Sequence, residues 1–350
     1  MNIRRTSASL AILGLLGLTA CGEVGADEDA EAADGEEAPD LGEGEYSLAS
    51  MAQGTAWYSY GIGVAGEVQE HSEDISNIEV LTYSGGIGNP ELVAEGDVDL
   101  ALSFNTFTEW AYEGAEGTPF EEEEFDNLRV LVGGMDEYYM GLMAPGGLEA
   151  ETLQDVIDQE MGTDIFALPA GSAEEALTPM LLEAHGSSLE EIEEWGGSIE
   201  YTGVDVSADA VRDGRADLWF QSVADGYPAV TELAQQADIE FLEYTDEALD
   251  HLADEWGITA ETLPAGTFHG QEEEVRLVGW MTGLVTSEDM DDEAAYAITE
   301  AVVENYQSLV DANASLEPFD PELAASEEIN GSVPLHPGAE QYYRDAGLLD

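Results

Sequence analysis

Short apolar runs alternate with helix-like segments along most of this chain, and this alternation constrains its fold more than any other feature. The strand-like runs lie at residues 46–51, 78–83, 99–104, 128–132, 164–168, 199–204, 218–221 and 239–242. The helix-like segments lie at residues 58–70, 89–95, 153–160, 173–185, 206–214, 228–236 and 293–309. Strands that alternate with helices predict an α/β fold with largely parallel sheets. Residues 46–350 are too many for one typical hydrophobic core, so we expect two domains.

Acidic residues dominate the charge of the chain. It has 78 Asp plus Glu against 7 basic residues, all of them Arg. Charged residues make up 24% of the sequence, an ordinary share for a globular protein, so the acids take the surface positions that Lys would normally occupy. Self-repulsion opposes folding in dilute buffer, whereas molar salt shortens the Debye length to about 3 Å and screens the repulsion. We therefore expect a halophilic protein that works outside the cell.

The sequence lacks the motifs of the main alternative classes. Nucleic-acid binding is excluded because no basic patch could meet phosphates. A cation-binding acidic protein would need a loop such as D-x-[DN]-x-[DN]-G, which is absent. Residues 61–66 match G-x-G-x-x-G, but they lie within a helical pattern and indicate helix–sheet packing rather than a nucleotide site. With no catalytic motif and no metal-ligand spacing among the five histidines, we expect no enzyme activity, no cofactor and no metal.

The N-terminus resembles a bacterial lipoprotein signal. Two arginines precede an apolar run at residues 10–18, which is too short to span a bilayer, and Leu-Thr-Ala-Cys then ends at Cys21, the single cysteine. The resemblance implies a signal peptide at residues 1–20 and a membrane anchor through an acylated Cys21. Residues 21–45 are acidic and nearly free of large apolar side chains, so we expect a flexible linker. The alternative is an ordinary signal peptide followed by an unrelated cysteine.

Three loops rich in small residues lead from a predicted strand into a helix-like segment. They lie at residues 53–58, 84–89 and 169–174. Each leaves backbone N–H groups free at a helix N-terminus, which is a ready site for anionic groups. Because the loops are spread over both expected domains, we expect a cleft that grips a small carboxylate from two sides.

The candidate ligand-binding residues come from these loops and from strand ends. From the loops we take Gly54, Thr55, Trp57, Tyr58, Ser84, Gly85, Asn89, Gly171, Ser172 and Ala173. At strand ends, where open α/β sheets place ligand contacts, we take Asn105, Phe220 and Gln221. The alternative for each aromatic residue is packing in the core. Basic residues are too few to predict an arginine that clamps a ligand carboxylate.

Five segments, in order over residues 46–349, resemble the TAXI solute-binding proteins of TRAP transporters. The segments are Gly54-Thr55-Ala56-Trp57-Tyr58, residues 84–101, Pro169-Ala170-Gly171-Ser172, residues 263–271 and residues 334–343. The last two are the most specific. The chain departs from the family pattern at Ala56, where a glycine is usual, and at Ala173-Glu174-Glu175, where a Gly-Thr pair is common.

The resemblance implies a two-lobed, type II-like periplasmic-binding-protein fold, with a ligand cleft between two lobes of mostly parallel sheet flanked by helices. Lobe I would comprise residues 46–139 and 268–350, and lobe II residues 140–267, with hinges near Tyr139 and Thr267. The implied function is to capture a glutamate-like organic acid or amino acid as a monomer and deliver it to a TRAP permease. The alternatives are a solute-binding lipoprotein of an ABC importer and a ligand-sensing lipoprotein without a transporter.

We predict that folding depends on salt. Removal of residues 1–20 leaves a formal charge of 5 − 78 = −73. Circular dichroism should show loss of structure below roughly 0.5 M salt, where the Debye length exceeds about 4 Å. Equal thermal stability in about 0.1 M and about 3 M NaCl would contradict the prediction.

Overall fold

The computed structural model describes residues 41–349 except residues 54, 84 and 122, and these described residues belong to one compact unit. The predicted signal peptide at 1–20, Cys21 and most of the predicted linker at 21–45 lie outside the described residues. Within the described part of the chain, no helix is both long and apolar enough to cross a membrane.

The first sheet has the strand order β2-β1-β3-β12-β4. Its strands are β1 (Glu45–Ser50), β2 (Asn77–Thr82), β3 (Leu100–Phe104), β4 (Leu128–Val132) and β12 (Thr282–Ser287). Strand β1 pairs in parallel with β2 and β3, whereas β12 is antiparallel to β3 and β4. The helices that follow these strands are α1 (Ala56–His71), α2 (Gly88–Glu95), α3 (Asn105–Glu113), α10 (Asp292–Glu304), α11 (Tyr306–Ala312), η1 (Ala314–Leu316), α12 (Glu327–Asn330) and α13 (Pro337–Asp345). Helix α10 packs against both α1 and α13, and α2 packs against β3 and α3.

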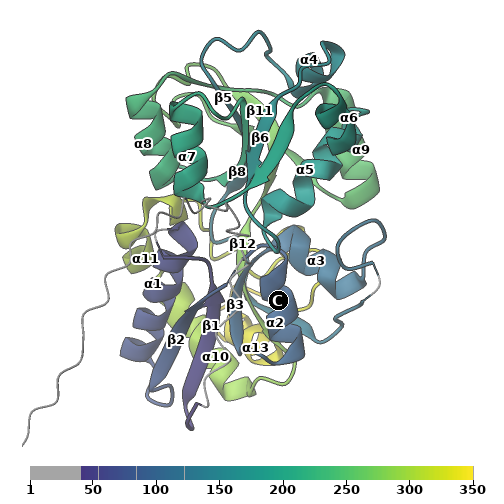
Figure 1. Ribbon diagram of the computed structural model, residues 1–350. Helices are drawn as coiled ribbons and strands as arrows, with labels where there is room; N and C mark the ends of the chain where they lie inside the picture. Colours follow the sequence, from purple (N-terminus) through teal and green to yellow (C-terminus); the bar gives the residue numbers. More distant parts are fainter. Residues whose placement is uncertain (1–40, 54, 84, 122, 350) are drawn as a thin grey trace, which may run out of the picture. The chain divides into compact units, whose positions relative to one another are not determined.

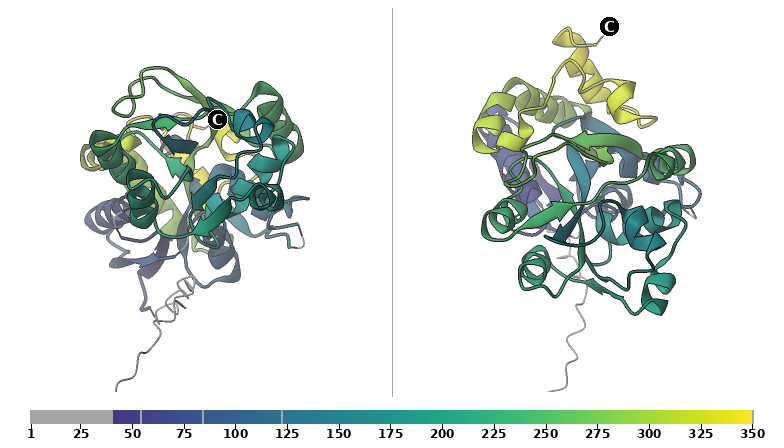
Figure 2. Two further views of the ribbon diagram at one scale, coloured as in Figure 1. Left: turned by 45° about the horizontal axis from the view of Figure 1, so that its top comes forward. Right: turned by 90° about the horizontal axis from the view of Figure 1, so that it is seen from above.

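The second sheet has the order β10-β11-β5-β8-β6-β7, and β9 also pairs with β5. Its strands are β5 (Tyr138–Pro145), β6 (Asp164–Ala167), β7 (Ser198–Tyr201), β8 (Leu218–Val223), β9 (Ile239–Phe241), β10 (Thr259–Leu263) and β11 (Val275–Trp280). Strand β6 is parallel to β7 and β8, and the other pairs are antiparallel. The accompanying helices are α4 (Leu153–Asp158), α5 (Ala173–Ala184), α6 (Leu189–Glu194), α7 (Val204–Arg212), α8 (Pro228–Gln236) and α9 (Asp246–Trp256). Figure 1 shows α7 and α8 on one side of this sheet and α5, α6 and α9 on the other, and Figure 2 gives two further views.

Local sequence explains the elements that lead to the cleft. In α1, the buried side chains of Trp57, Tyr60, Val64 and Val68 recur every three or four residues and form one apolar face. The helix begins after Thr55, whose hydroxyl accepts a hydrogen bond from the N–H of the third helical residue. In β8, all six residues are buried, as expected for a central strand covered on both faces.

The predicted α/β fold class is confirmed, but both sheets are mixed rather than mostly parallel. Residues 133–137 connect β4 of the first sheet to β5 of the second, and Met281 alone separates β11 from β12. We expected a return to the first lobe near Thr267, whereas β11 extends the second sheet as far as Trp280. The sequence hides this change of sheet because residues 275–286 form one apolar run.

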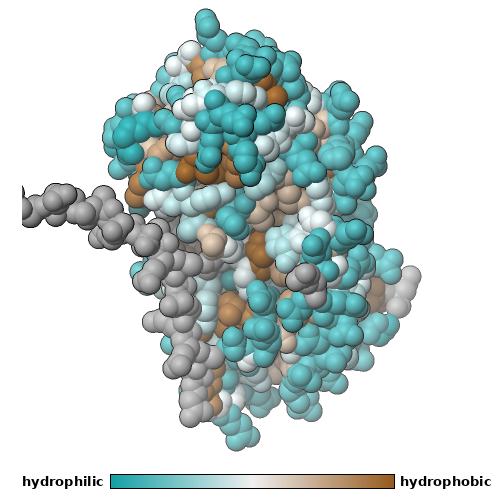
Figure 3. Space-filling model, turned by 45° about the vertical axis from the view of Figure 1, so that its right-hand side comes forward, coloured by the Kyte–Doolittle hydropathy of each residue, from teal (hydrophilic) through white to brown (hydrophobic). Residues whose placement is uncertain are grey.

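Most of the face shown in Figure 3 is hydrophilic, with apolar side chains in small separate areas. The large apolar side chains that remain exposed in the described residues are Ile62, Val206 and Leu323. The core is therefore closed in spite of the high charge, and the acids are carried by its surface.

Candidate functional site

A small cavity lies where loops of the two sheets meet. Its lining residues are Met51, Thr55, Trp57, Gly86, Phe104, Tyr138, Ala173, Glu174, Gln221, Ser222 and Tyr227. The space that water can occupy in it is about 20 Å³, which is enough for about one water molecule. A solute therefore reaches this cavity only when the two sheets move apart.

The structure brings together the three loops singled out in the sequence. Thr55 and Trp57 come from the loop after β1 and the first turn of α1, Gly86 from the loop after β2, and Ala173 from the start of α5 after the β6 loop. These positions lie beyond the carboxyl ends of parallel strands, where α/β sheets place ligands. Of the residues predicted at strand ends, Gln221 of β8 also lines the cavity.

Two of the loops are in direct contact across the cleft. The backbone N–H groups of Ile87 and Gly88 both donate to the carbonyl of Gly171, at 3.1 and 3.3 Å. Gly86 has a positive φ of 32°, and a Cβ atom there would lie 2.6 Å from the backbone nitrogen of Ala173. Only glycine permits this close approach.

Glu174 is the most unusual group in the cavity wall. It is 2% exposed, and its Oε1 accepts hydrogen bonds from the N–H of Ser222 at 2.7 Å and from Nε2 of Gln221 at 3.1 Å. Burial raises the pKa of its carboxyl, while the hydrogen bond from the Ser222 backbone opposes the rise. Sequence reasoning noted this position as the end of the 169–174 loop and as a departure from a family pattern, but gave its side chain no role, because one acid among 78 carries no signal.

Aromatic rings form another part of the wall. The rings of Trp57 and Phe104 lie 4.5 Å apart, and Phe104 is 5.2 Å from Tyr138. The indole Nε1 of Trp57 donates to Oγ1 of Thr282 at 3.0 Å. The N–H of Thr282 in turn donates to Oδ1 of Asp136 at 3.0 Å. This chain of bonds links the cavity to both crossings between the sheets.

Asp136 is fully buried beside three other titratable groups. Desolvation raises the pKa of its carboxyl from 3.8 to about 7, the Thr282 and Tyr60 hydrogen bonds oppose the rise, and the Glu137 charge adds to it. The phenol of Tyr138 is also close enough to interact with the Asp136 charge. Because an isolated buried carboxylate is costly, much of this group carries a proton near neutral pH.

Several predicted site residues have structural contacts instead. Asn105 accepts from the N–H of Met281 at 3.0 Å and donates to the carbonyl of Ile329 at 2.9 Å. Asn89 is fully buried and donates to the carbonyl of Leu102 at 2.8 Å. Phe220 is fully buried in β8 and belongs to the hydrophobic core. None of the three lines the cavity.

The remaining predicted residues flank the site or cannot be placed. Gly85 and Gly171 have φ angles of 82° and 83° and shape the two contacting loops. Ser172 caps α5 by accepting from the N–H of Glu175. Tyr58 is the neighbour of Trp57 but does not line the cavity. Gly54 and Ser84 lie outside the described residues.

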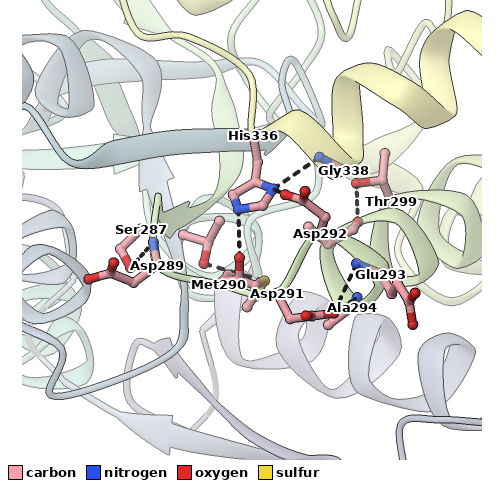
Figure 4. Close-up of polar contacts among 12 residues, drawn as sticks. Ser287, Asp289, Met290, Asp291, Asp292, Glu293, Ala294, Thr299, His336 and Gly338 are labelled. Carbon is pink, nitrogen blue, oxygen red and sulfur yellow. Dashed lines mark hydrogen bonds and ion pairs between the residues drawn. The ribbon is translucent and has the colours of Figure 1, made fainter.

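His336, in one of the segments that resemble the TAXI proteins, is a helix cap. Its Nδ1 accepts from the N–H of Gly338 at 3.1 Å, so Nε2 carries the proton and donates to the carbonyl of Met290 at 3.0 Å (Figure 4). Burial lowers the pKa of the ring, which favours this neutral form. In the described ranges, no group of three or more His, Cys, Asp and Glu side chains could hold a metal ion.

A larger hollow of about 480 Å³ lies nearby, between residues 263–267 and 314–318. Its acidic side chains, Glu137, Asp225 and Glu317, are all exposed. Such groups stay solvated and impose little orientation on a ligand. The smaller cavity has buried polar side chains from α5 and β8 opposite aromatic rings, and we therefore take it as the candidate site.

A family model described as the NMT1-like family matches residues 48–347. The chain belongs to the NMT1-like family. The description of this family does not name the TAXI proteins, so that closer kinship stays a prediction.

Solved structures show the fold. MatC from Rhodopseudomonas palustris with bound malate is 13% identical, with 87% of this chain and 99% of that chain covered and a TM-score of 0.54. A TctC solute binding protein from Polaromonas is 14% identical, with 78% and 88% covered, and its TM-score of 0.45 is too low to carry an argument. The fold is that of the two-lobed periplasmic solute-binding proteins.

We predict that Asp136 makes the protein more stable in mild acid than in mild base. The unfolded carboxyl has a pKa of about 3.9 and the folded one about 7. Between these values the folded state binds the extra proton, so stability falls as pH rises, by at most about 1.4 kcal/mol per pH unit. Denaturant unfolding in molar salt at about pH 5 and pH 8 should show this fall.

Asp136→Asn should flatten the fall, because the amide oxygen still accepts from Thr282 and no charge develops. Asp225→Asn, at an exposed acid, is the matched control and should keep the slope of the wild type. An Asp136→Asn protein with an unchanged slope would show that other groups cause the pH dependence.

Proposed function

We propose that this protein is an extracytoplasmic solute-binding protein that captures a small organic acid or amino acid between its two lobes. The observation that carries the proposal is the meeting of segments from both sheets around one small cavity lined by aromatic rings and a few buried polar side chains. Membership of the NMT1-like family and the likeness to MatC support it. The protein would perform no chemistry on its solute.

Capture would work by closure of the lobes. The chain crosses between the sheets at residues 133–137 and at Met281. Two short connecting segments of this kind permit a hinge motion. In the closed arrangement, Ile87 and Gly88 bond to Gly171 across the cleft. A solute that contacts both lobes favours this arrangement, because its binding energy is realised only when they meet.

An acidic group on the solute is supported by two helix starts. Helices α1 and α5 both begin at the cavity, where their first N–H groups have no partner within the helix. MatC, whose structure contains malate, shares the fold. No arginine of the described residues lines the cavity, so backbone N–H groups would bind the carboxylate.

We propose that the protein delivers its solute to a TRAP-type secondary transporter, and the resemblance to TAXI proteins supports this partner. The protein would be tethered to the membrane through Cys21, and the acidic segment at residues 21–45 would let the folded part reach its permease. A gene for a fused TRAP permease beside this one would support the assignment.

We predict that Gly86→Ala weakens solute binding about tenfold or more. The added Cβ would lie 2.6 Å from the nitrogen of Ala173 and would prevent closure. Gly88→Ala is the control, because a Cβ there meets nothing within 4 Å. Calorimetry in molar salt against glutamate, 2-oxoglutarate, alanine, pyruvate and malate would provide the affinities. Failure of every acid to bind the wild type would refute the proposed solute class, and equal affinities of both variants would refute closure at Gly86.

We predict that Cys21→Ser releases the protein from membranes, because serine cannot take a thioether-linked lipid. Fractionation and mass spectrometry of the mature N-terminus provide the measurement. If the variant stays with membranes and the wild-type N-terminus is not an acylated Cys21, the anchor is wrongly assigned.

A further inference from the structure

We propose that Glu174, Gln221 and Ser222 bind a primary ammonium group, so that the solute is an amino acid rather than a plain organic acid. This inference rests on the proposed function, since it concerns the same cavity. The helix N-termini would bind the carboxylate of the solute, and the inference concerns the group at its other end.

The first step is the missing counter-charge of Glu174. Its carboxyl is buried in the cavity wall, and burial favours the protonated form of an acid unless a cation lies beside it. Of the basic residues that the structure describes, none lines the cavity: four arginines pair with acids elsewhere, namely Arg129 with Glu288, Arg212 with Asp209, Arg276 with Asp246 and Arg344 with Glu340. A cationic group on the solute would supply what the protein lacks.

The second step is the orientation of Gln221. Its Nε2 donates to Glu174, so the amide cannot be turned over without placing its oxygen against the carboxylate. Its Oε1 is therefore fixed as an acceptor, and it has no hydrogen-bond partner among the described residues although the side chain is 1% exposed. A buried acceptor without a donor is unfavourable, so a donor from the solute would stabilise this position.

The third step is the hydroxyl of Ser222. It lies beside the Glu174 carboxylate, but within the described chain its Oγ makes no hydrogen bond of normal geometry. The cavity wall thus offers a carboxylate, an amide oxygen and a hydroxyl oxygen on residues that are bonded to one another. A primary ammonium has three N–H donors for three such acceptors.

This set of acceptors discriminates between cations. A quaternary ammonium would find aromatic rings in Trp57, Phe104 and Tyr138 and the charge of Glu174. It has no N–H, however, and would leave the Gln221 and Ser222 oxygens unsatisfied. A primary ammonium satisfies these oxygens and still lies beside the rings.

The arrangement also accounts for both ends of an amino acid. Glu174 already places a carboxylate in the first turn of α5, which leaves the start of α1 for the carboxylate of the solute. The solute would then join the lobes by its own two charges. An amino acid bound in this way brings a positive group to lobe II and a negative group to lobe I.

The test compares amino acids with relatives that lack a primary ammonium group. Calorimetry in molar KCl would pair glutamate with 2-oxoglutarate, alanine with pyruvate, and glycine with glycine betaine. We expect at least one amino acid to bind about 100-fold more tightly than its partner. If 2-oxoglutarate or pyruvate binds as tightly as its amino acid, the inference is overturned and the proposed function remains intact. The same holds if this binding appears when NaCl replaces KCl and takes place through a bound sodium ion. If no compound binds, both fail.

Variants locate the group. Glu174→Gln keeps an oxygen that can accept from Ser222 but removes the charge, and it should weaken amino-acid binding at least tenfold. Glu175→Gln is the matched control, because Glu175 is in the same turn but does not line the cavity. Ser222→Ala removes only the hydroxyl and should weaken binding severalfold. Should Glu174→Gln fail to fold by circular dichroism, Ser222→Ala and the ligand pairs decide; an unchanged affinity in a folded Glu174→Gln protein overturns the inference.

Discussion

Contact between the loops at Gly86 and Gly171 is the interaction on which the site depends. The chain crosses between the two sheets at residues 133–137 and at Met281, and noncovalent contacts must bring the loops of the site together. The two hydrogen bonds to Gly171 bring together Trp57 from one sheet and Glu174 from the other. Burial of the polar groups, and with it their shifted pKa values, follows from this closure.

Sequence reasoning predicted the fold and the loops, because both depend on local patterns. Strand and helix periodicity marked the α/β class, and small residues after strands marked the loops of Thr55 and Ala173. The burial of Glu174 could not be predicted from the sequence, because it depends on the packing of α5 against β8. Asn105 shows the same limit: a polar residue after a strand can contact a ligand or the backbone, and its hydrogen bond to Met281 depends on residues far apart in the sequence.

Most acidic side chains are accommodated by exposure to solvent rather than by ion pairs with basic residues. The arginine ion pairs of the described residues lie at the surface, where such pairs contribute at most about 1 kcal/mol each. Most acids consequently have no basic partner, and salt ions must screen them. The buried acids Asp136 and Glu174 are exceptions, since salt does not reach them, and their environment is set by named hydrogen bonds.

The absence of a side chain at Gly86 has a consequence for which solutes are accepted. Because the closed loops already touch at this point, a solute too long for the cleft would hold them apart and leave the N–H groups of Ile87 and Gly88 without the Gly171 carbonyl. The free energy lost there does not depend on the chemistry of the solute. The backbone contact between the loops thus selects the length of the solute, whereas side chains of the cavity recognise its charge.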